Sequence, residues 1–320
     1  MLICDSRARM HHVTGGTFRM GSDEHYPEEG PAHAVRVDDF WIDETPVTNA
    51  DFAVFVAATS HVTLAERTPD PALYPGILPE MIKAGSLVFD KTTGPVPLHD
   101  FTAWWSFRFG ADWRHPQGPG SSIDGLEGHP VVHVAHDDAA TYAAWAGKSL
   151  PTEAEWEFAA RGGVEGLAYA WGDELAPGGA MLANYWQGQF PWQNLALDGY
   201  ERTSPVRAYP PNGYGLRDMI GNVWEWTEDW FAAYDRTSQS ADKPDGSCCI
   251  PANPRGGREE ASRDPCQPDI PIGRKVLKGG SHLCAETYCR RYRPAARYAQ
   301  PVDTSTCHVG FRCVVRAPGQ

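Results

Sequence analysis

Apolar residues recur along this chain in short runs rather than in long periodic segments. Between Gly15 and Val37, the stretch Gly-Thr-Phe-Arg-Met-Gly and the alternating Ala-Val-Arg-Val are separated by a polar turn. This pattern predicts two short strands. Near the other end of the chain, Lys275–Gly280 and Val309–Val315 are also typical of strands.

Helix-start signals are clear at Thr48. Thr48 can cap a helix with Asp51 at the N3 position, and Val47 with Phe52 can form a hydrophobic staple. We expect this first helix to end near Ser60.

Two further helices are expected in the middle of the chain. One begins at Asp137, carries Ala140, Ala144 and Trp145 along one side, and stops at Gly147.

The other opens at Thr152, because Thr-Glu-Ala-Glu is a capping box that closes on Glu155. Gly162 and Gly163 end it.

Much of the remaining chain shows no regular period. Gly and Pro together make up about 18% of the residues, against roughly 12% in average proteins, and 12 Trp and 12 Tyr accompany them. Residues 234–275 are polar and rich in Pro and Gly, which predicts a long insertion loop. No linker divides the chain, so the prediction is a single α+β domain with short strands, few helices and much irregular structure.

Composition and charge exclude several classes of partner. No apolar run approaches the roughly 20 residues of a membrane helix, so we expect no membrane association. The net charge of -13 argues against nucleic acid, which requires a basic surface. Met1–Met10 has no apolar core of a secretory signal.

The eight cysteines crowd toward the last quarter of the chain and form no Cys-x-x-Cys zinc pair. A disulfide scaffold is the weaker interpretation in a large chain without a signal peptide. Redox or metal chemistry is therefore a hypothesis for these residues: Cys4, Cys248, Cys249, Cys266, Cys284, Cys289, Cys307 and Cys313.

Motifs spread over nearly the whole chain carry a family resemblance. In order, they are Gly16-Thr-Phe-Arg-Met-Gly21, Pro46-Val-Thr-Asn49, Trp113-Arg-His-Pro116, His129-Pro-Val-Val-His-Val134, Leu150-Pro-Thr-Glu-Ala-Glu-Trp-Glu157, Arg161-Gly-Gly163, Asn184-Tyr-Trp-Gln-Gly188, Pro211-Asn-Gly-Tyr-Gly-Leu216, Gly221-Asn-Val-Trp-Glu-Trp226, Gly279-Gly-Ser281 and Gly310-Phe-Arg-Cys313.

This set resembles the formylglycine-generating enzyme, or sulfatase-modifying factor, family in its bacterial form. The resemblance implies one C-type-lectin-like domain over residues 13–316, with the insertion loop at 234–275 inside it. It also implies an oxidoreductase that uses O₂ and copper to convert a cysteine in an unfolded sulfatase Cys-x-Pro-x-Arg peptide into Cα-formylglycine. The sequence does not fix the oligomeric state, and a monomer is the default expectation.

The segment that discriminates the activity contains Cys284 and Cys289. In the family's oxidases this pair binds Cu(I), and soft thiolates select Cu(I). Arg290 and Arg291 lie beside the pair and can favour the thiolate form. From spacing alone, a structural disulfide or two buried thiols remains the alternative.

Other site residues follow from the resemblance. Ser281 matches the family's active-site serine, and Trp224 and Tyr288 match aromatic walls of its cleft, although core packing is the alternative for each aromatic residue. His308 stands where the family often has Asn, beside the expected peptide groove. There it would change charge near pH 6.5.

Pro294 and Ala160 replace cysteines that form disulfides in secretory-pathway members of the family. The chain lacks those bridges, so we expect a reducing, cytoplasmic setting in a bacterium.

Two segments match the family's calcium positions, and calcium prefers hard oxygen ligands. The alternative for these loop carboxylates is ordinary solvation. The first set is Asn184, Tyr185, Asp198 and Tyr200, and the second set is Asp218, Gly221, Val223 and Glu225.

The histidines at 129, 133 and 136 invite a metal hypothesis, but Pro130 and the Val-Val run favour a strand with hydrogen-bonded core histidines. Cys248, Cys249 and Cys266 lie in the insertion, and the sequence assigns them no role.

A different function on the same fold is the competing hypothesis: a lectin-like binding module, or a sulfur-transfer relative. The ergothioneine-type relatives carry an extra helical domain with a His-x-x-x-Glu iron motif, which this chain lacks. A pure binding module has no reason to keep both Cys284 and Cys289. These two observations favour the oxidase.

Overall fold

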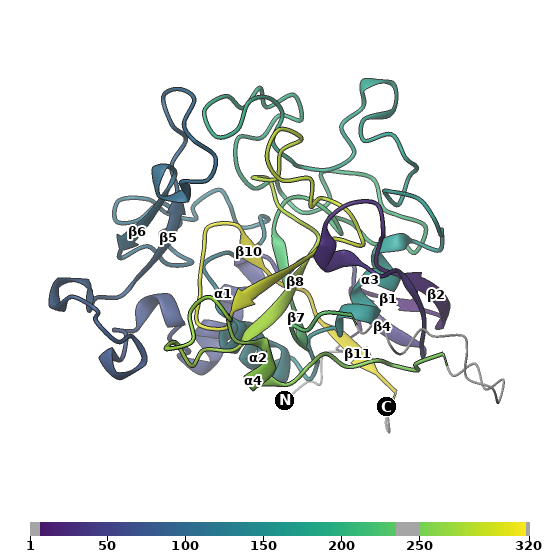
Figure 1. The fold of residues 1–320 in the computed structure, drawn as a ribbon, viewed down its shortest axis with the longest axis horizontal. Helices are drawn as coiled ribbons and strands as arrows, with labels where there is room; N and C mark the ends of the chain where they lie inside the picture. The colour runs from purple at the N-terminus through teal and green to yellow at the C-terminus, as the bar shows by residue number, and fades with distance from the viewer. Residues whose placement is uncertain (1–6, 235–249, 318–320) are drawn as a thin grey trace.

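The computed structural model describes residues 7–234 and 250–317. A four-stranded sheet occupies the centre (Figure 1) in the order β10-β7-β8-β9. Its neighbours are antiparallel except for β10 and β7, which run parallel. The strands are β7 (Trp224–Trp230), β8 (Arg274–Lys278), β9 (Arg297–Pro301) and β10 (Val309–Gly310).

A second sheet joins the two ends of the described chain. β4 (Phe40–Asp43) lies between β1 (Met10–Val13) and β11 (Val314–Arg316), and both neighbours are antiparallel to it. The expected strand over Val309–Val315 is therefore wrong as a single element. Residues 311–313 turn the chain from the central sheet into this one, so β10 and β11 belong to different sheets.

Two hairpins lie on opposite sides of the central sheet (Figure 1). β2 (Gly16–Met20) pairs with β3 (His33–Val37), which confirms the two strands expected between Gly15 and Val37. β5 (Gly85–Phe89) pairs with β6 (Trp105–Phe109) on the other side.

The described residues contain four α-helices: α1 (Asn49–Thr59), α2 (His136–Trp145), α3 (Glu153–Arg161) and α4 (Glu259–Ser262). Six 3₁₀ turns complete the elements: η1 (Pro27–Glu29), η2 (Leu64–Glu66), η3 (Pro71–Leu73), η4 (Pro79–Met81), η5 (Phe101–Ala103) and η6 (Pro177–Gly179). None of the described helices has the length and apolarity needed to cross a membrane.

The helix-capping predictions are confirmed for α1 and α3. Thr48 and Asp51 form the reciprocal capping box of α1, and Thr152 and Glu155 form that of α3. Ser60 ends α1, one position after its last helical residue. These local hydrogen bonds satisfy backbone N–H groups that no helix can pair internally.

The buried face of α2 is not the side that carries Ala140, Ala144 and Trp145. Asp138, Ala139, Tyr142 and Ala143 face the core, whereas Trp145 is 43% exposed. Asp138 is buried because its carboxylate accepts hydrogen bonds from the backbone N–H groups of Ala135 and Leu64. The capping contacts of Asp138 therefore hold its side of the helix against the core.

Fold and core agree with the single α+β domain expected from the sequence. One large cluster of buried apolar side chains unites both sheets with α1, α2 and α3. A smaller cluster, built mainly of aromatic residues, lies beneath the β5–β6 hairpin. Of the expected insertion, residues 250–273 contain only α4, and 235–249 lie outside the described residues.

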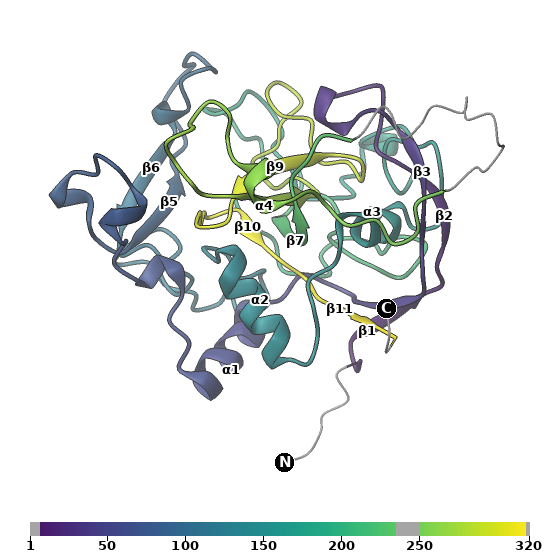
Figure 2. The same ribbon diagram turned by 60° about the horizontal axis from the view of Figure 1, so that its bottom comes forward.

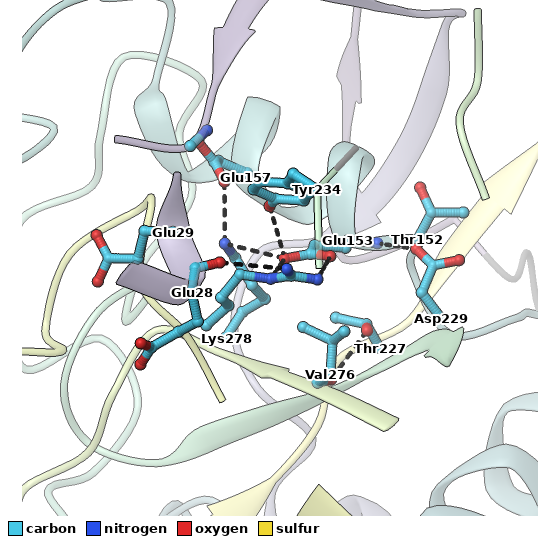
Figure 3. Close-up of polar contacts among 12 residues, drawn as sticks. Glu28, Glu29, Thr152, Glu153, Glu157, Thr227, Asp229, Tyr234, Val276 and Lys278 are labelled. Carbon is cyan, nitrogen blue, oxygen red and sulfur yellow. Dashed lines mark hydrogen bonds and ion pairs between the residues drawn. The ribbon is translucent and has the colours of Figure 1, made fainter. Parts of the chain in front are cut away.

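Buried ion pairs connect α3 with strands β8 and β9 (Figure 3). Glu157 Oε2 lies 2.9 Å from Lys278 Nζ, and Glu157 Oε1 accepts from Arg161 at 2.7 Å. Glu153 binds the guanidinium of Arg297 through both carboxylate oxygens. Lys278 is the last residue of β8 and Arg297 the first of β9, so two glutamates one helical turn apart hold both ends of loop 279–296.

Removing the charge of Glu157 is expected to destabilise the protein strongly. Glu157→Gln removes the anion 2.9 Å from the buried ammonium of Lys278 and leaves it only Glu153, which is 3.8 Å away and already paired with Arg297. Breaking such a buried pair costs about 3–5 kcal/mol of unfolding free energy. Urea denaturation at neutral pH measures this loss. The exposed Glu165→Gln is the matched control, and it should change stability by less than about 0.5 kcal/mol. Equal stability of the two variants would show that the ion pair between Glu157 and Lys278 does not stabilise the fold.

Candidate active site

A cleft of about 600 Å³ opens between the β5–β6 hairpin and the central sheet. The six residues that the sequence singled out for catalysis and substrate binding all line it, although they come from three separate segments. They are Trp224, Ser281, Cys284, Tyr288, Cys289 and His308.

Two glycines allow the turn that begins the cysteine loop, residues 279–296. Gly279 and Gly280 have φ values of 91° and 69°, a region that favours glycine. A Cβ on Gly280 would lie 2.6 Å from the carbonyl oxygen of Arg291, so only glycine allows the loop to close on itself. The turn after β8 then directs Ser281 and Cys284 into the cleft.

The two cysteines lie side by side as free thiols. Cys284 Sγ is 3.4 Å from Cys289 Sγ, well beyond the roughly 2 Å of a disulfide. The backbone brings them together, because Cys289 N donates to Ala285 O at 2.7 Å. Cys284 is buried, and Cys289 is partly open to the cleft.

Their surroundings give the two thiols opposite pKa shifts. The hydrogen bond from Cys284 and the nearby guanidinium of Arg291 hold the pKa of Cys289 below its usual range. Burial raises the pKa of Cys284. Cys289 is therefore the more acidic thiol of the pair, with Cys284 as its hydrogen-bond donor.

Arg291 is the basic residue that touches the pair. Its Nη1 lies 3.7 Å from Cys289 Sγ, and its Nη2 binds Glu28 at 2.6 Å. The guanidinium also lies 3.9 Å from the ring centre of Tyr26. Arg290, which the sequence also suggested, is exposed and makes no described contact with either thiol.

Aromatic side chains form the wall beside Cys289. Tyr288 stacks on Phe190 with ring centres 4.5 Å apart, and Trp104 meets Tyr288 edge-on. Sequence analysis missed Phe190 and Trp104, because neither belongs to a motif near the cysteines. The adjacent tryptophans 104 and 105 were the available signal.

His308 touches Ser281 rather than packing away from the site. Its Nδ1 lies 3.0 Å from Ser281 Oγ, and Trp105 meets its ring edge-on. Burial lowers the pKa of His308 to about 3, although part of its surface faces the cleft. The expected charge change near pH 6.5 is therefore wrong, and the ring stays neutral at physiological pH.

The first predicted calcium set converges in part. The side-chain amide of Gln187 donates both to Tyr185 O and to Asp198 Oδ2. The two oxygen atoms, Tyr185 O and Asp198 Oδ2, thus converge on one amide nitrogen, and a bound cation could contact the same two atoms. The carboxylate of Asp198 also accepts from Tyr200 N, whereas the side chain of Asn184 donates to Arg202 O.

The second set does not form a comparable clamp. Both carboxylate oxygens of Glu225 bind the buried guanidinium of Arg312, and Trp156 donates to Oε2. Asp218 accepts from Arg207 N instead. Gly221 and Val223 are buried beside them. With Glu225 neutralised by Arg312, this set does not fit a calcium ion.

None of the three histidines at 129, 133 and 136 lies in a strand, so the strand predicted there is wrong. His133 is fully buried and bonds to Ser86 Oγ and Pro116 O, as expected of a hydrogen-bonded core histidine. His129 contacts Thr203, and His136 lies edge-on to Trp226. The described residues contain no cluster of three or more His, Cys, Asp or Glu side chains suited to a metal.

Among the other cysteines, Cys266 is exposed, and Cys307 and Cys313 are buried free thiols. Cys4, Cys248 and Cys249 lie outside the described residues.

Comparison with known proteins gives a consistent result. Residues 4–317 match the model of the sulfatase-modifying factor enzyme 1-like domain. The chain is 52% identical to the formylglycine-generating enzyme of Mycobacterium tuberculosis over 94% of this chain and 96% of that protein. It is 47% identical to the formylglycine-generating enzyme of Streptomyces coelicolor, over 94% and 87%.

A solved structure supports the fold. PvdO from Pseudomonas aeruginosa superimposes with a TM-score of 0.59 at 23% identity, covering 98% of this chain and 96% of that chain.

Arg291 is expected to set the acidity of Cys289. In metal-free protein, Arg291→Ala removes the cation beside the thiolate and should raise the pKa of Cys289 by about one pH unit. The rate of Cys289 alkylation against pH, followed by mass spectrometry, measures this shift. Arg290→Ala is the matched control and should leave the midpoint in place. An unchanged midpoint in Arg291→Ala would show that Arg291 has no such role.

Proposed function

Since the chain belongs to the family of sulfatase-modifying factor enzyme 1-like proteins, we propose that it is an enzyme converting a cysteine of an unfolded sulfatase into Cα-formylglycine. The single observation that carries this proposal is the pair of free thiols at the floor of the cleft. A binding module has no need for two adjacent thiols at the base of its ligand site.

The thiol pair fits a Cu(I) ion. Two sulfur atoms 3.4 Å apart, one of them favoured as a thiolate, are the soft donor set that this ion prefers. Cys284 and Cys289 would hold it, and when bound it supplies the one-electron and dioxygen chemistry of the oxidation. The cleft leaves room beside the pair for a third sulfur, that of the substrate cysteine.

The surrounding residues of this chain bind and orient that cysteine. Ser281 Oγ and the neutral ring of His308 form a hydrogen-bonded pair beside the thiols, where they can donate to and accept from the reacting group. The stacked rings of Tyr288 and Phe190 shield the reacting group from water, and Trp224 also lines the cleft. The peptide backbone would lie extended across the cleft, with the Cys-x-Pro-x-Arg sequence as the recognised substrate.

Loss of either thiol is expected to abolish conversion. Cys284→Ser and Cys289→Ser remove a soft ligand and should lower turnover of a Cys-x-Pro-x-Arg peptide by about a hundredfold or more. The assay supplies Cu(I) and O₂ and detects the aldehyde by mass spectrometry.

Cys266→Ser is the matched control, because Cys266 is exposed and does not line the cleft. It should keep full activity. Near-normal conversion by a folded Cys284→Ser or Cys289→Ser variant would refute the assignment.

Calcium is proposed for the first set only, as a structural ion that ties residues 184–200 together. Adding Ca²⁺ to chelator-treated protein should raise Tm, because an ion that binds only the native state stabilises it by mass action. Asp198→Asn should lose this response, and Asp218→Asn should keep it. A Tm that does not respond to Ca²⁺ in the parent protein would exclude the site.

A further inference from the structure

A second hollow, of about 710 Å³, adjoins the cleft and has no role in the chemistry described above. We call it the apolar groove. The 3₁₀ turns η2 to η4 form one wall, residues 264–274 form another, and residues 301–305 lie at its base. Figure 2 shows the segment after α4 lying between β9 and the β5–β6 hairpin.

The apolar groove exposes large hydrophobic side chains. Leu73, Leu78, Met81 and Phe107 line it and are 46%, 58%, 37% and 40% exposed. Single exposed apolar residues are ordinary, but a contiguous hollow of them marks a binding surface.

Specific hydrogen bonds fix the walls in position. Tyr74 donates to Asp303 Oδ2 at 2.5 Å, which ties the 3₁₀ segment to the base. Arg274 donates to the carbonyl oxygens of Ser262 and Arg263, which holds the opposite wall. These hydrogen bonds therefore hold the segments that carry the apolar residues in fixed positions.

The apolar groove is continuous with the catalytic cleft. Leu87 and Thr304 line both hollows. β9 is an edge strand of the central sheet and runs from the cleft to the apolar groove. Its residues Tyr298 and Gln300 line the cleft, and Pro301 lines the groove. An extended chain that leaves the cleft along β9 enters the apolar groove.

From this continuity, we infer that the apolar groove binds apolar side chains of the substrate polypeptide in the segment flanking the target cysteine. This inference rests on the proposed function. The chemistry of the surface selects the occupant: a folded protein buries its large apolar side chains, whereas an unfolded chain offers them. The groove would thus favour an unfolded substrate over a folded one.

Peptide extension tests this role. Three peptides share the Cys-x-Pro-x-Arg core: the core alone, the core extended by Leu- and Phe-containing residues, and the core extended by Gly and Ser to equal length. Each extension is made on either side of the cysteine. On one side, the apolar extension should lower KM about tenfold relative to the Gly/Ser extension.

Variants assign the gain to the apolar groove. In Leu78→Ser/Met81→Ser, the KM ratio between the Gly/Ser and the apolar extensions should fall to about one. Leu197→Ser, at an exposed leucine of another loop, should keep the full ratio. Both side chains of the double variant are exposed, so an unchanged Tm is expected and confirms folding.

Two outcomes would overturn the inference: equal KM values for apolar and Gly/Ser extensions on both sides, or a ratio that survives in the double variant. Failure of the proposed function is recognised separately, because the core peptide alone would then not be converted. In that case, fluorescence anisotropy of labelled extended peptides still measures whether the groove prefers apolar residues.

Discussion

The charge pairing between α3 and the ends of the cysteine loop is the constraint on which the active-site geometry depends. Glu157 holds Lys278 before the loop, and Glu153 holds Arg297 after it. All four side chains are buried, so none can exchange its partner for water at low cost. Loop 279–296 has little regular structure of its own, and these two contacts fix where it begins and ends.

The same device continues inside the loop. Arg293 forms a buried pair with Glu29, and Arg291 reaches Glu28. Each pair connects the loop to η1, which lies some 260 residues earlier in the chain. Because Arg291 also touches Cys289, its anchoring to Glu28 and Tyr26 places a positive charge beside the more acidic thiol. Arg291 therefore both anchors the loop and sets the electrostatic environment of Cys289.

The surfaces proposed to recognise the substrate have a different origin from this charged framework. The aromatic wall of the cleft and the exposed apolar residues of the groove both come from segments outside the sheets or from the β5–β6 hairpin. Irregular chain suits this purpose, since loops carried on a rigid scaffold can vary without disturbing the core. The scaffold supplies position, and the loops supply the contacts.

Local sequence determined those features that depend on neighbouring residues. The capping boxes at Thr48 and Thr152 and the strands β2 and β3 follow from hydrogen bonds or side-chain patterns within a few positions, whereas the strand expected over Lys275–Gly280 ends at Lys278 because Gly279 and Gly280 turn the chain. The motifs around Cys284, Ser281 and His308 also identified residues that line the cleft, because their resemblance to the family assigned them to its active site.

Tertiary structure decided whatever depends on partners far away in the chain. Glu225 looked like a calcium ligand, but Arg312 neutralises it across 87 positions. His308 looked titratable near neutral pH, but its burial lowers its pKa to about 3. The choice of Arg291 over Arg290, the split of β10 from β11 and the apolar groove were likewise not visible in the sequence. Burial and long-range pairing arise only when distant segments meet, so no local pattern encodes them.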